Sequence, residues 1–360
     1  MADDDPVVTA ARAGDESAFA ALVERHRREL LVHCYRMLGS LEESEDLVQE
    51  TFLRAWKNLP GFAGRSTLRA WLYRIATNAC LDVLNGRARR VLPHQLAAPS
   101  PPDAPLPPPA DVAWLQPFPD RLAEPVAPSD ERPDVVVVAR ETIELAFLAA
   151  IQYLPPRQRA VLILRDVLGW PARQIADLLD GSVASVNSAA QRARATLREH
   201  LPERRLEWTR PADPGEQEQA VLRRYMDAME RADLAAVAEL LAADVRATMP
   251  PSPIWFQGRD AVMASLATSW DTGSPAYVGR FRMVPAPANR QPAAAAYVRR
   301  PGDAEHRPFA IGVLQITGDR IAEMTAFHDP GLFPAFALPA TLPPRDRPGR
   351  GQGRRRRQMV

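Results

Sequence analysis

Side chains able to read a nucleic acid are concentrated in the stretch QIADLLDGSVASVNSAAQRARATLRE, residues 174–199. Apolar residues recur there with helical spacing at Val183, Val186, Ala190, Ala193 and Leu197, so the polar residues between them point outward. Asn and Gln side chains pair well with adenine, and arginine pairs with guanine or phosphate. We therefore predict DNA contacts by Arg173, Ser182, Ser185, Asn187, Ser188, Gln191, Arg192 and Arg194.

The surrounding sequence predicts a helix-turn-helix that would position these side chains. PPRQRAVLILRDVLG indicates a helix ending at Gly169, PARQIADLLD indicates a second helix, Gly181 turns the chain, and Ser182 caps a long final helix. In a helix-turn-helix the N-terminal part of the last helix enters the major groove of DNA. A plain helical hairpin with a glycine turn gives a similar pattern and remains the alternative.

Two further helices are predicted near the N-terminus. In EDLVQETFLRAW the apolar residues lie on one face, which leaves Asp46, Gln49, Glu50 and Arg54 outside it. After the break PGFAGRS, the helix TLRAWLYRIATNACLDVL leaves Arg69, Arg74 and Asn78 for another surface. The alternative is that these polar residues only solvate a helical bundle.

Composition and proline density define the domain organisation. The chain has 360 residues and a net charge of +1, so basic surfaces must be local. The predicted parts are a helical block at 6–90, a proline-rich acidic linker at 91–139, the helix-turn-helix block at 140–205, a third block at 216–340 and a basic tail at 341–360.

Cysteine usage and hydropathy exclude several classes of protein. Cys34 and Cys80 lie far apart within helical patterns, which indicates buried reduced thiols rather than a disulfide framework or a metal site. No apolar run reaches the length of a membrane span, and the start MADDDPVV is acidic where a signal peptide is basic. We expect a cytoplasmic protein without metal or cofactor.

Taken together, the two helical blocks resemble the RNA polymerase sigma-70 family, in particular its extracytoplasmic-function (ECF) group. EDLVQETFLRAW and WLYRIATNACLDVLN resemble region two, and LPPRQRAVLILRDVLGWPARQIADLLDGSVASVNSAAQRARATL resembles region four. The resemblance covers residues 6–205 and implies a non-enzymatic transcription initiation factor that binds promoter DNA and the beta-prime clamp and beta flap of core polymerase.

The resemblance also implies roles for individual residues. Asp46, Gln49, Glu50 and Arg54 would bind the polymerase clamp, and the last helix would read the minus-35 element. The minus-10 element would be contacted by Phe62, Arg65, Ser66, Arg69, Arg74 and Asn78. Many relatives carry a basic residue where Asn187 and Ala189 stand, which predicts weaker phosphate binding here.

The linker combines two features. Residues 91–139 carry seven acidic and two basic residues, which suits the basic path through polymerase that this family's linker follows. A tether whose acidity is incidental is the alternative. Within it, WLQPFPDRL (114–122) would leave two aromatic rings in water, so we predict that this segment is docked. Similar Trp-Leu-x-Pro motifs occur in sigma-factor groups with a fused C-terminal domain, such as the mycobacterial SigG-like group.

The third block is predicted to be α+β. Helical periodicity covers EQEQAVLRRYMDAMERADLAAVAELLAADV with a turn at Asp233, a further helix covers GRDAVMASLATSW, and RPFAIGVLQITGDRIAEMTAFHD alternates about Gly318–Asp319 as a β-hairpin. The block resembles the cone-shaped SnoaL-like, or NTF2-like, fold, whose members are cyclases, isomerases or ligand-binding modules. Arg290 and Ala337 stand where glycine is expected, which puts only local turns in doubt.

Three functions remain open for this third block. The most economical is regulation of the sigma factor from within the chain, which implies no separate anti-sigma factor. A ligand pocket would be lined by Tyr225, Trp255, Trp270, Tyr297 and Phe327, although aromatic residues at such spacing are usually core packing. An enzyme or small-molecule sensor fused to a DNA-binding regulator is the rival; its acid–base candidates are Asp227, Asp244, His328 and Asp329. The basic tail would grip phosphates or simply be solvated.

Overall fold

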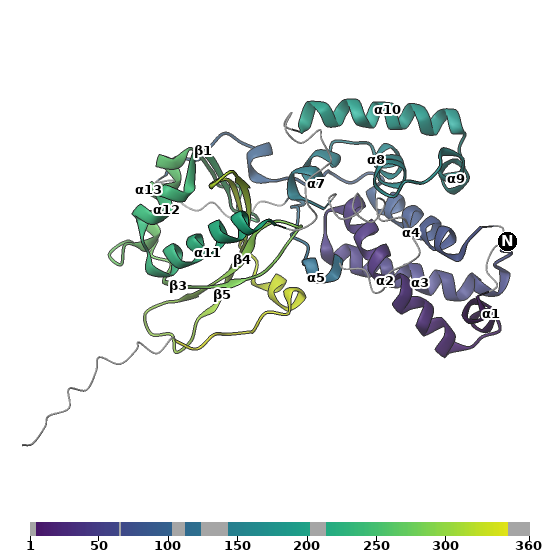
Figure 1. Cartoon of the computed structure of the whole chain (residues 1–360), viewed down its shortest axis with the longest axis horizontal. Coiled ribbons are helices and arrows are strands. Elements are labelled where there is room, and N and C mark those ends of the chain that lie inside the picture. The colour runs from purple at the N-terminus through teal and green to yellow at the C-terminus, as the bar shows by residue number, and fades with distance from the viewer. Residues whose placement is uncertain (1–4, 65, 103–111, 124–142, 202–213, 345–360) are drawn as a thin grey trace, which may run out of the picture.

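The computed structural model describes residues 5–64, 66–102, 112–123, 143–201 and 214–344. Helical regions from the first half of the chain lie beside a sheet with its own helices from the second half (Figure 1). The α7 helix lies between these two parts, while α10 runs along an outer edge of the helical part (Figure 1).

The N-terminal helical block is formed by four α-helices and a short 3₁₀ turn. Side-chain caps start the longer helices: Asp15 begins α2, Ser40 begins α3 and Thr67 begins α4. Gly39 ends α2 in the left-handed conformation, with φ of 69°. The elements are α1 (Pro6–Arg12), α2 (Glu16–Leu38), α3 (Leu41–Asn58), η1 (Leu59–Gly61) and α4 (Leu68–Leu84).

The helix-turn-helix block confirms the predicted order of helices. Ser182 caps the last helix through a reciprocal pair of hydrogen bonds with Ser185, each of 3.1 Å. The left-handed residue of the turn is Asp180, with φ of 49°, rather than the predicted Gly181. The elements are η2 (Pro93–Gln95) and α5 (Asp120–Ala123) in the linker, then α7 (Leu145–Ile151), α8 (Pro156–Leu162), the π-helical turn η3 (Ile163–Val167), α9 (Ala172–Leu178) and α10 (Val183–His200).

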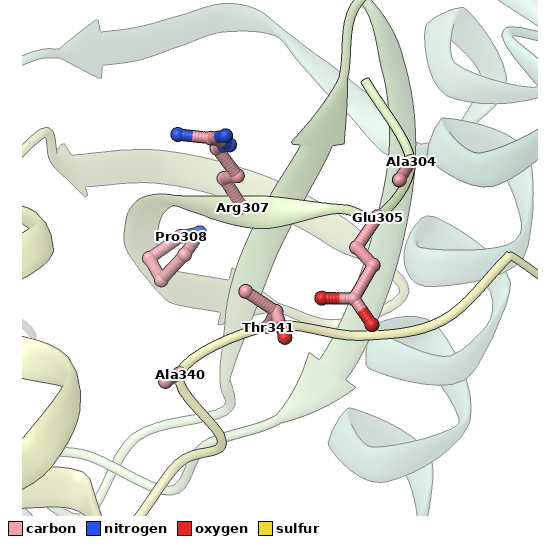
Figure 2. A pocket seen from close by; sticks show the side chains of 6 residues that line it. All are labelled: Ala304, Glu305, Arg307, Pro308, Ala340 and Thr341. Atoms are coloured by element: carbon pink, nitrogen blue, oxygen red, sulfur yellow. The ribbon is translucent and has the colours of Figure 1, made fainter.

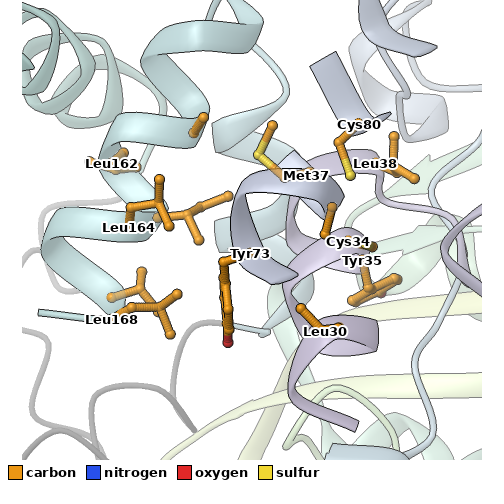
Figure 3. Close-up of a cluster of buried hydrophobic side chains, with 14 of the residues drawn as sticks. Leu30, Cys34, Tyr35, Met37, Leu38, Tyr73, Cys80, Leu162, Leu164 and Leu168 are labelled. Atoms are coloured by element: carbon orange, nitrogen blue, oxygen red, sulfur yellow. The ribbon is translucent and has the colours of Figure 1, made fainter. Parts of the chain in front are cut away.

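The two helical blocks share one hydrophobic core. Figure 3 shows Tyr73 of α4 between the α2 side chains and the leucines of α8 and η3. The Tyr73 ring lies 5.1 Å from that of Trp170, and Leu162 and Leu164 are fully buried. Since apolar burial is the main stabilising term, regions predicted as separate blocks are held together as one unit.

Both cysteines lie in this core as free thiols, as predicted. Cys34 and Cys80 have no exposed surface. The hydrogen bond to Cys34, together with burial, raises the pKa of the Cys80 thiol well above its usual range. A thiol held in its neutral form is a poor nucleophile, so these residues serve packing.

The third block is an α+β domain with a six-stranded sheet, as predicted. The strand order is β2-β1-β6-β5-β4-β3, and β1 pairs with β6 in parallel while the other pairs are antiparallel. The predicted hairpin joins β5 and β6 through Gly318, with φ of 64°. The elements are α11 (Glu216–Arg231), α12 (Leu234–Leu240), β1 (Leu241–Thr248), β2 (Trp255–Gln257), α13 (Arg259–Trp270), β3 (Arg280–Pro285), β4 (Ala293–Arg299), β5 (Arg307–Thr317), β6 (Arg320–Phe327) and η5 (Pro330–Phe336).

Two hydrophobic clusters form on this sheet. The first packs α11, α12 and α13 against it, and the second packs η5 against it together with Leu145 from the helix-turn-helix block. Leu145 is 5% exposed and begins α7. The third domain is therefore in direct apolar contact with the start of region four.

A buried histidine makes the stability of the first block depend on pH. A 2.9 Å hydrogen bond joins His33 Nε2 to Thr77 Oγ1. Burial lowers the pKa of His33 from 6.5 to about 3. The folded state therefore keeps His33 neutral while the unfolded chain binds a proton below its ordinary pKa, so stability falls as the pH drops from about 6.5. At about pH 5 the titration of His33 alone should lower the free energy of unfolding by about 2 kcal/mol.

Urea unfolding of the wild-type chain and of His33→Gln at about pH 7 and about pH 5 measures this effect. Glutamine can place a nitrogen near the Nε2 position without titrating, so the variant should lose less stability on acidification than the wild type does. Equal losses in the two proteins would show that His33 does not titrate on unfolding.

Candidate polymerase and promoter interface

The polymerase-binding residues predicted on α3 lie on one outward face. Val48, Phe52 and Ala55 are buried on the opposite side, so the helix presents its polar residues to solvent. Arg54 Nε donates a 2.7 Å hydrogen bond to Glu50 Oε1, one turn earlier. This face contains Asp46, Gln49, Glu50 and Arg54, of which Glu50 is half-buried.

An apolar residue in the middle of this face was missed by the sequence analysis. Leu53 is 57% exposed and lies one turn from Gln49 and Glu50. Among the described residues it is the large apolar side chain that α3 exposes within the face predicted to bind polymerase, so it is available to a binding partner. The available signal was that Leu53 falls outside the buried apolar stripe of its own helix.

The arginines predicted to contact the minus-10 element are held by carboxylates. Arg69 Nε donates to Glu29 Oε2 at 2.7 Å, and its guanidinium lies 5.4 Å from the centroid of the Tyr73 ring. Arg74 donates to Asp180 Oδ1 at 2.8 Å. Because Asp180 belongs to the turn of the helix-turn-helix, this ion pair joins the two helical blocks at a side chain predicted to contact DNA.

The loop before α4 carries Phe62, one of the predicted minus-10 contacts. This side chain is 6% exposed and its ring lies 5.1 Å from that of Trp71, so it packs as a core residue, and its contact with bases stays a prediction. The ring packs on the first turn of α4, to which Trp71 belongs. Ser66 is exposed and Asn78 is half-buried, while Arg65 lies outside the described residues.

Replacing Phe62 with alanine should therefore destabilise the first block rather than change promoter choice. Loss of a buried phenylalanine costs about 3–5 kcal/mol. Urea unfolding of the full chain measures the cost, and Phe62→Leu should recover part of it. A variant with wild-type stability and altered minus-10 preference would instead support the original assignment.

On α10 the predicted minus-35 set is solvent-facing. Val186, Ala190, Ala193 and Leu197 pack inward as predicted, but the prediction was wrong for Val183, which lies in the first turn and is 44% exposed. Ser182 and Ser185 are engaged with each other as the helix cap, so their hydroxyls already have hydrogen-bond partners. The exposed members of the predicted set are Arg173, Ser182, Ser185, Asn187, Ser188, Gln191, Arg192 and Arg194.

The predicted docking of segment 114–122 is confirmed. Leu115 and Phe118 have no exposed surface, and the Phe118 ring lies 4.6 Å from that of Tyr35. Gln116 Oε1 accepts hydrogen bonds from Ser40 Oγ at 2.9 Å and from the Leu41 N–H at 2.8 Å. The linker is thereby fixed to the junction of α2 and α3.

Asn289 of the third domain joins this docked segment to both helical blocks. Its Nδ2 donates to Tyr35 Oη at 2.9 Å and to the Ile143 carbonyl at 2.6 Å, and its Oδ1 accepts from the Phe118 N–H at 2.9 Å. The residue is fully buried and has φ of 55°. The next residue, Arg290, also has a positive φ, and its N–H donates to Asp120 Oδ1 at 2.8 Å.

A second contact joins the start of the linker to the edge of the third-domain sheet. Trp255 Nε1 donates to the Ala97 carbonyl at 2.9 Å, and the Ser100 N–H donates to the Trp255 carbonyl at 2.8 Å. The His94 ring lies 6.2 Å from that of Trp255. Trp255 thus anchors the linker, although the sequence analysis placed it in a ligand pocket.

The other residues predicted to line that pocket do not come together. Tyr225 and Trp270 belong to the cluster beneath the helices, whereas Tyr297 and Phe327 belong to the cluster beneath η5. Tyr297 Oη donates to the Pro339 carbonyl at 2.7 Å. The predicted residues are therefore divided between two hydrophobic clusters and the linker contact of Trp255.

The acid–base candidates are also dispersed. Asp227 pairs with Arg231 on the surface of α11, Asp244 is exposed, and Asp329 accepts from the Gly331 N–H at 2.8 Å as the cap of η5. Burial lowers the pKa of His328 to about 4, and its ring lies 4.7 Å from that of Phe309. Among the described residues, no hydrogen bond joins these four groups to one another.

A groove of about 440 Å³ lies between the start of β5 and the segment that follows η5, lined by Ala304, Glu305, Arg307, Pro308, Ala340 and Thr341. Figure 2 shows the Glu305 carboxylate near Thr341, with Arg307 directed away from them. None of the predicted site residues lines this groove. Within the described ranges there is no cluster of metal-ligating side chains and no helix long and apolar enough to span a membrane.

Comparison with known proteins supports the division into three modules. The Sigma-70 region 2 family matches residues 22–90, the Sigma-70 region 4 family matches 144–197, and the SnoaL-like domain family matches 222–324. ECF RNA polymerase sigma factor SigG of Mycobacterium tuberculosis is 46% identical over 332 residues, which is 92% of this chain and 86% of that protein.

Two other similarities differ in extent. ECF RNA polymerase sigma factor SigW of Bacillus subtilis is 32% identical over 190 residues, covering 53% of this chain and 92% of that protein. The crystal structure of the M. tuberculosis extracytoplasmic function sigma factor SigJ aligns with a TM-score of 0.56 at 22% identity, covering 89% of this chain and 99% of that one. The fold is thus shared over both the helical part and the third domain.

Proposed function

This chain belongs to the ECF RNA polymerase sigma factors. On that basis we propose which of its surfaces binds polymerase and which bind the two promoter elements. The α3 face, defined as Asp46, Gln49, Glu50, Leu53 and Arg54, binds the polymerase clamp. The side chains Ser66, Arg69, Arg74 and Asn78 contact the minus-10 element. The outward side of α10 reads the minus-35 element, with Arg173 contributing from α9, and the beta flap of polymerase is the second partner of region four.

The observation that carries this proposal is the presence of an outward polar α3 face and an outward helix-turn-helix recognition helix on one shared core. Promoter opening requires capture of unstacked bases beside a sequence-reading module. A DNA-binding regulator without polymerase contacts would have no need for the α3 face.

We further propose that the third domain regulates the sigma factor. Asn289 bonds the docked linker and Ile143, two residues before α7, while the sheet edge at Trp255 holds the start of the linker. The pair formed by Arg74 and Asp180 holds the two DNA-facing modules against each other. In this closed arrangement Arg74, which is proposed to contact the minus-10 element, is paired with Asp180. The two modules must therefore separate before initiation.

Such internal control leaves room for a separate anti-sigma protein, and we do not retain the expectation that none is used. We propose that the third domain acts without catalysis. The support is the separation of Asp227, Asp244, His328 and Asp329, since acid–base catalysis requires such groups to converge on one substrate.

Reconstituted transcription tests the sigma assignment. The purified full-length chain is mixed with core polymerase from its source organism and with fragmented genomic DNA, and the RNA 5′ ends are sequenced. The expected result is a set of start sites that share upstream elements and disappear when the chain is omitted. The proposal fails if no start site depends on the chain while a known sigma factor directs initiation by the same core preparation.

A further inference from the structure

A π-helical turn holds two side chains of the recognition helix. The turn η3 contributes consecutive residues, Arg165 and Asp166, toward α10. Arg165 Nη1 donates to Asn187 Oδ1, and Asp166 accepts two hydrogen bonds from Arg194, at 2.8 and 2.5 Å. Asn187 and Arg194 are two helical turns apart, so one short segment controls one side of α10. Single π turns within helices often occur at functional sites.

The contact with Arg165 fixes the polarity of the Asn187 amide. A guanidinium has only N–H donors, so the atom of Asn187 that faces it must be the carbonyl oxygen and the amide cannot be the other way round. The Nδ2 group therefore points away from Arg165 with its two donors available. Arg165 is itself half-buried beside α10, which limits how far its side chain can move.

The contact with Asp166 neutralises the charge of Arg194. Both oxygens of one carboxylate are used, in the paired geometry that is strongest for arginine. The Asp166 side chain is 19% exposed and that of Arg194 is 44% exposed. An arginine engaged in this way contributes less to phosphate binding than an unpaired one on the same helix face.

We propose that Arg165 and Asp166 are positioning residues for minus-35 recognition. Arg165 orients the Asn187 amide so that its N–H donors face one base pair, and Asp166 weakens phosphate binding by Arg194. The inference rests on the proposed reading of promoter DNA by α10. In the major groove, guanine O6 and N7, adenine N7 and thymine O4 accept hydrogen bonds, whereas cytosine presents an N4 donor. Asn187 in its fixed orientation should therefore disfavour cytosine at the base that it faces.

The first test measures base preference at the minus-35 element. Holoenzyme assembled with the full chain transcribes a promoter library randomised across that element, and transcripts are sequenced. Wild type should disfavour cytosine at one position on the order of tenfold. Arg165→Ala frees the amide to rotate and present either group, so this discrimination should fall to about twofold. Arg165→Lys retains a donor-only group and should keep most of the preference.

Two matched variants separate positioning from simple loss of charge. Arg198→Ala removes a positive charge from the exposed last turn of α10, far from Asn187, and should leave base preference unchanged. In an Asn187→Ala background, Arg165→Ala should cause no further loss of discrimination at the same position. Thermal unfolding of each variant checks that the helix-turn-helix remains folded.

The second test measures the salt dependence of holoenzyme binding to a fixed promoter. Asp166→Asn should release Arg194, strengthen binding at moderate salt by about tenfold, and make the slope of log K against log salt steeper by about one. In the double variant that combines Asp166→Asn with Arg194→Ala, promoter binding should show no such increase.

The outcomes distinguish this inference from the sigma assignment on which it rests. If wild-type holoenzyme starts no transcript, the proposed function fails. If wild type transcribes with a clear minus-35 preference that Arg165→Ala leaves intact, and if Asp166→Asn leaves the salt slope intact, the positioning role is overturned. Where the alanine variant does not fold, Arg165→Gln serves in its place: its amide can present either a donor or an acceptor to Asn187, so the discrimination against cytosine should likewise fall, and an intact preference would overturn the positioning role.

Discussion

Simultaneous alanine substitution of Asp46, Gln49 and Glu50 should weaken binding to core polymerase on the order of 100-fold, because truncating one partner of a charge pair that becomes buried in an interface costs about 2–5 kcal/mol. All three lie on the outward face of α3 around Leu53, while the opposite face of the helix packs in the core. The folded structure should therefore persist. Equilibrium binding of labelled full-length chain to core polymerase measures the loss.

A matched control removes the same three residue types from helices of the third domain. Asp260, Gln217 and Glu239 are exposed there, and their joint replacement by alanine should leave polymerase binding unchanged. Leu53→Ala alone should weaken binding by about tenfold, since burying a leucine contributes about 1.5–3 kcal/mol and this one is already partly covered. Wild-type affinity of the triple variant would remove α3 from the polymerase interface and leave the rival DNA-binding enzyme as the better explanation.

Removal of the Asn289 side chain should release the third domain and raise transcription from the cognate promoter about tenfold or more. The side chain makes three buried hydrogen bonds, to Tyr35, Ile143 and Phe118. Each contributes about 1 kcal/mol, and leaving the partners unsatisfied and buried costs about 1–3 kcal/mol more. A shift of a few kcal/mol moves a closed population largely to the open state.

Two substitutions at this position separate hydrogen bonding from backbone strain. Asn289 has a positive φ, so alanine adds strain, whereas glycine removes the same side chain at little conformational cost. Both variants should increase transcription and the distance between dyes on α2 and α11. Asn85→Ala, at an exposed asparagine, serves as the control. Unchanged transcription and unchanged dye separation in the glycine variant would contradict regulation through this contact.

Local signals in the sequence determined the helix faces and their ends. Val186, Ala190 and Ala193 define the inner side of α10 by spacing alone, and Ser182 marks its start because a serine at that position satisfies an otherwise unpaired backbone N–H. The β5–β6 hairpin was likewise predictable from strand alternation around Gly318. These features depend on residues within a few positions of one another, so the sequence is sufficient to locate them.

Only the tertiary structure decided which of these surfaces meet. Pairing of Arg74 with Asp180 and convergence on Asn289 each join residues that are distant in the chain. Trp255 was assigned to a pocket because its ring is apolar, and its indole N–H proved to bond the linker. Residue type and periodicity give the outward or inward direction of a side chain, but the partner it meets depends on how the domains pack, and that is set by the shared core.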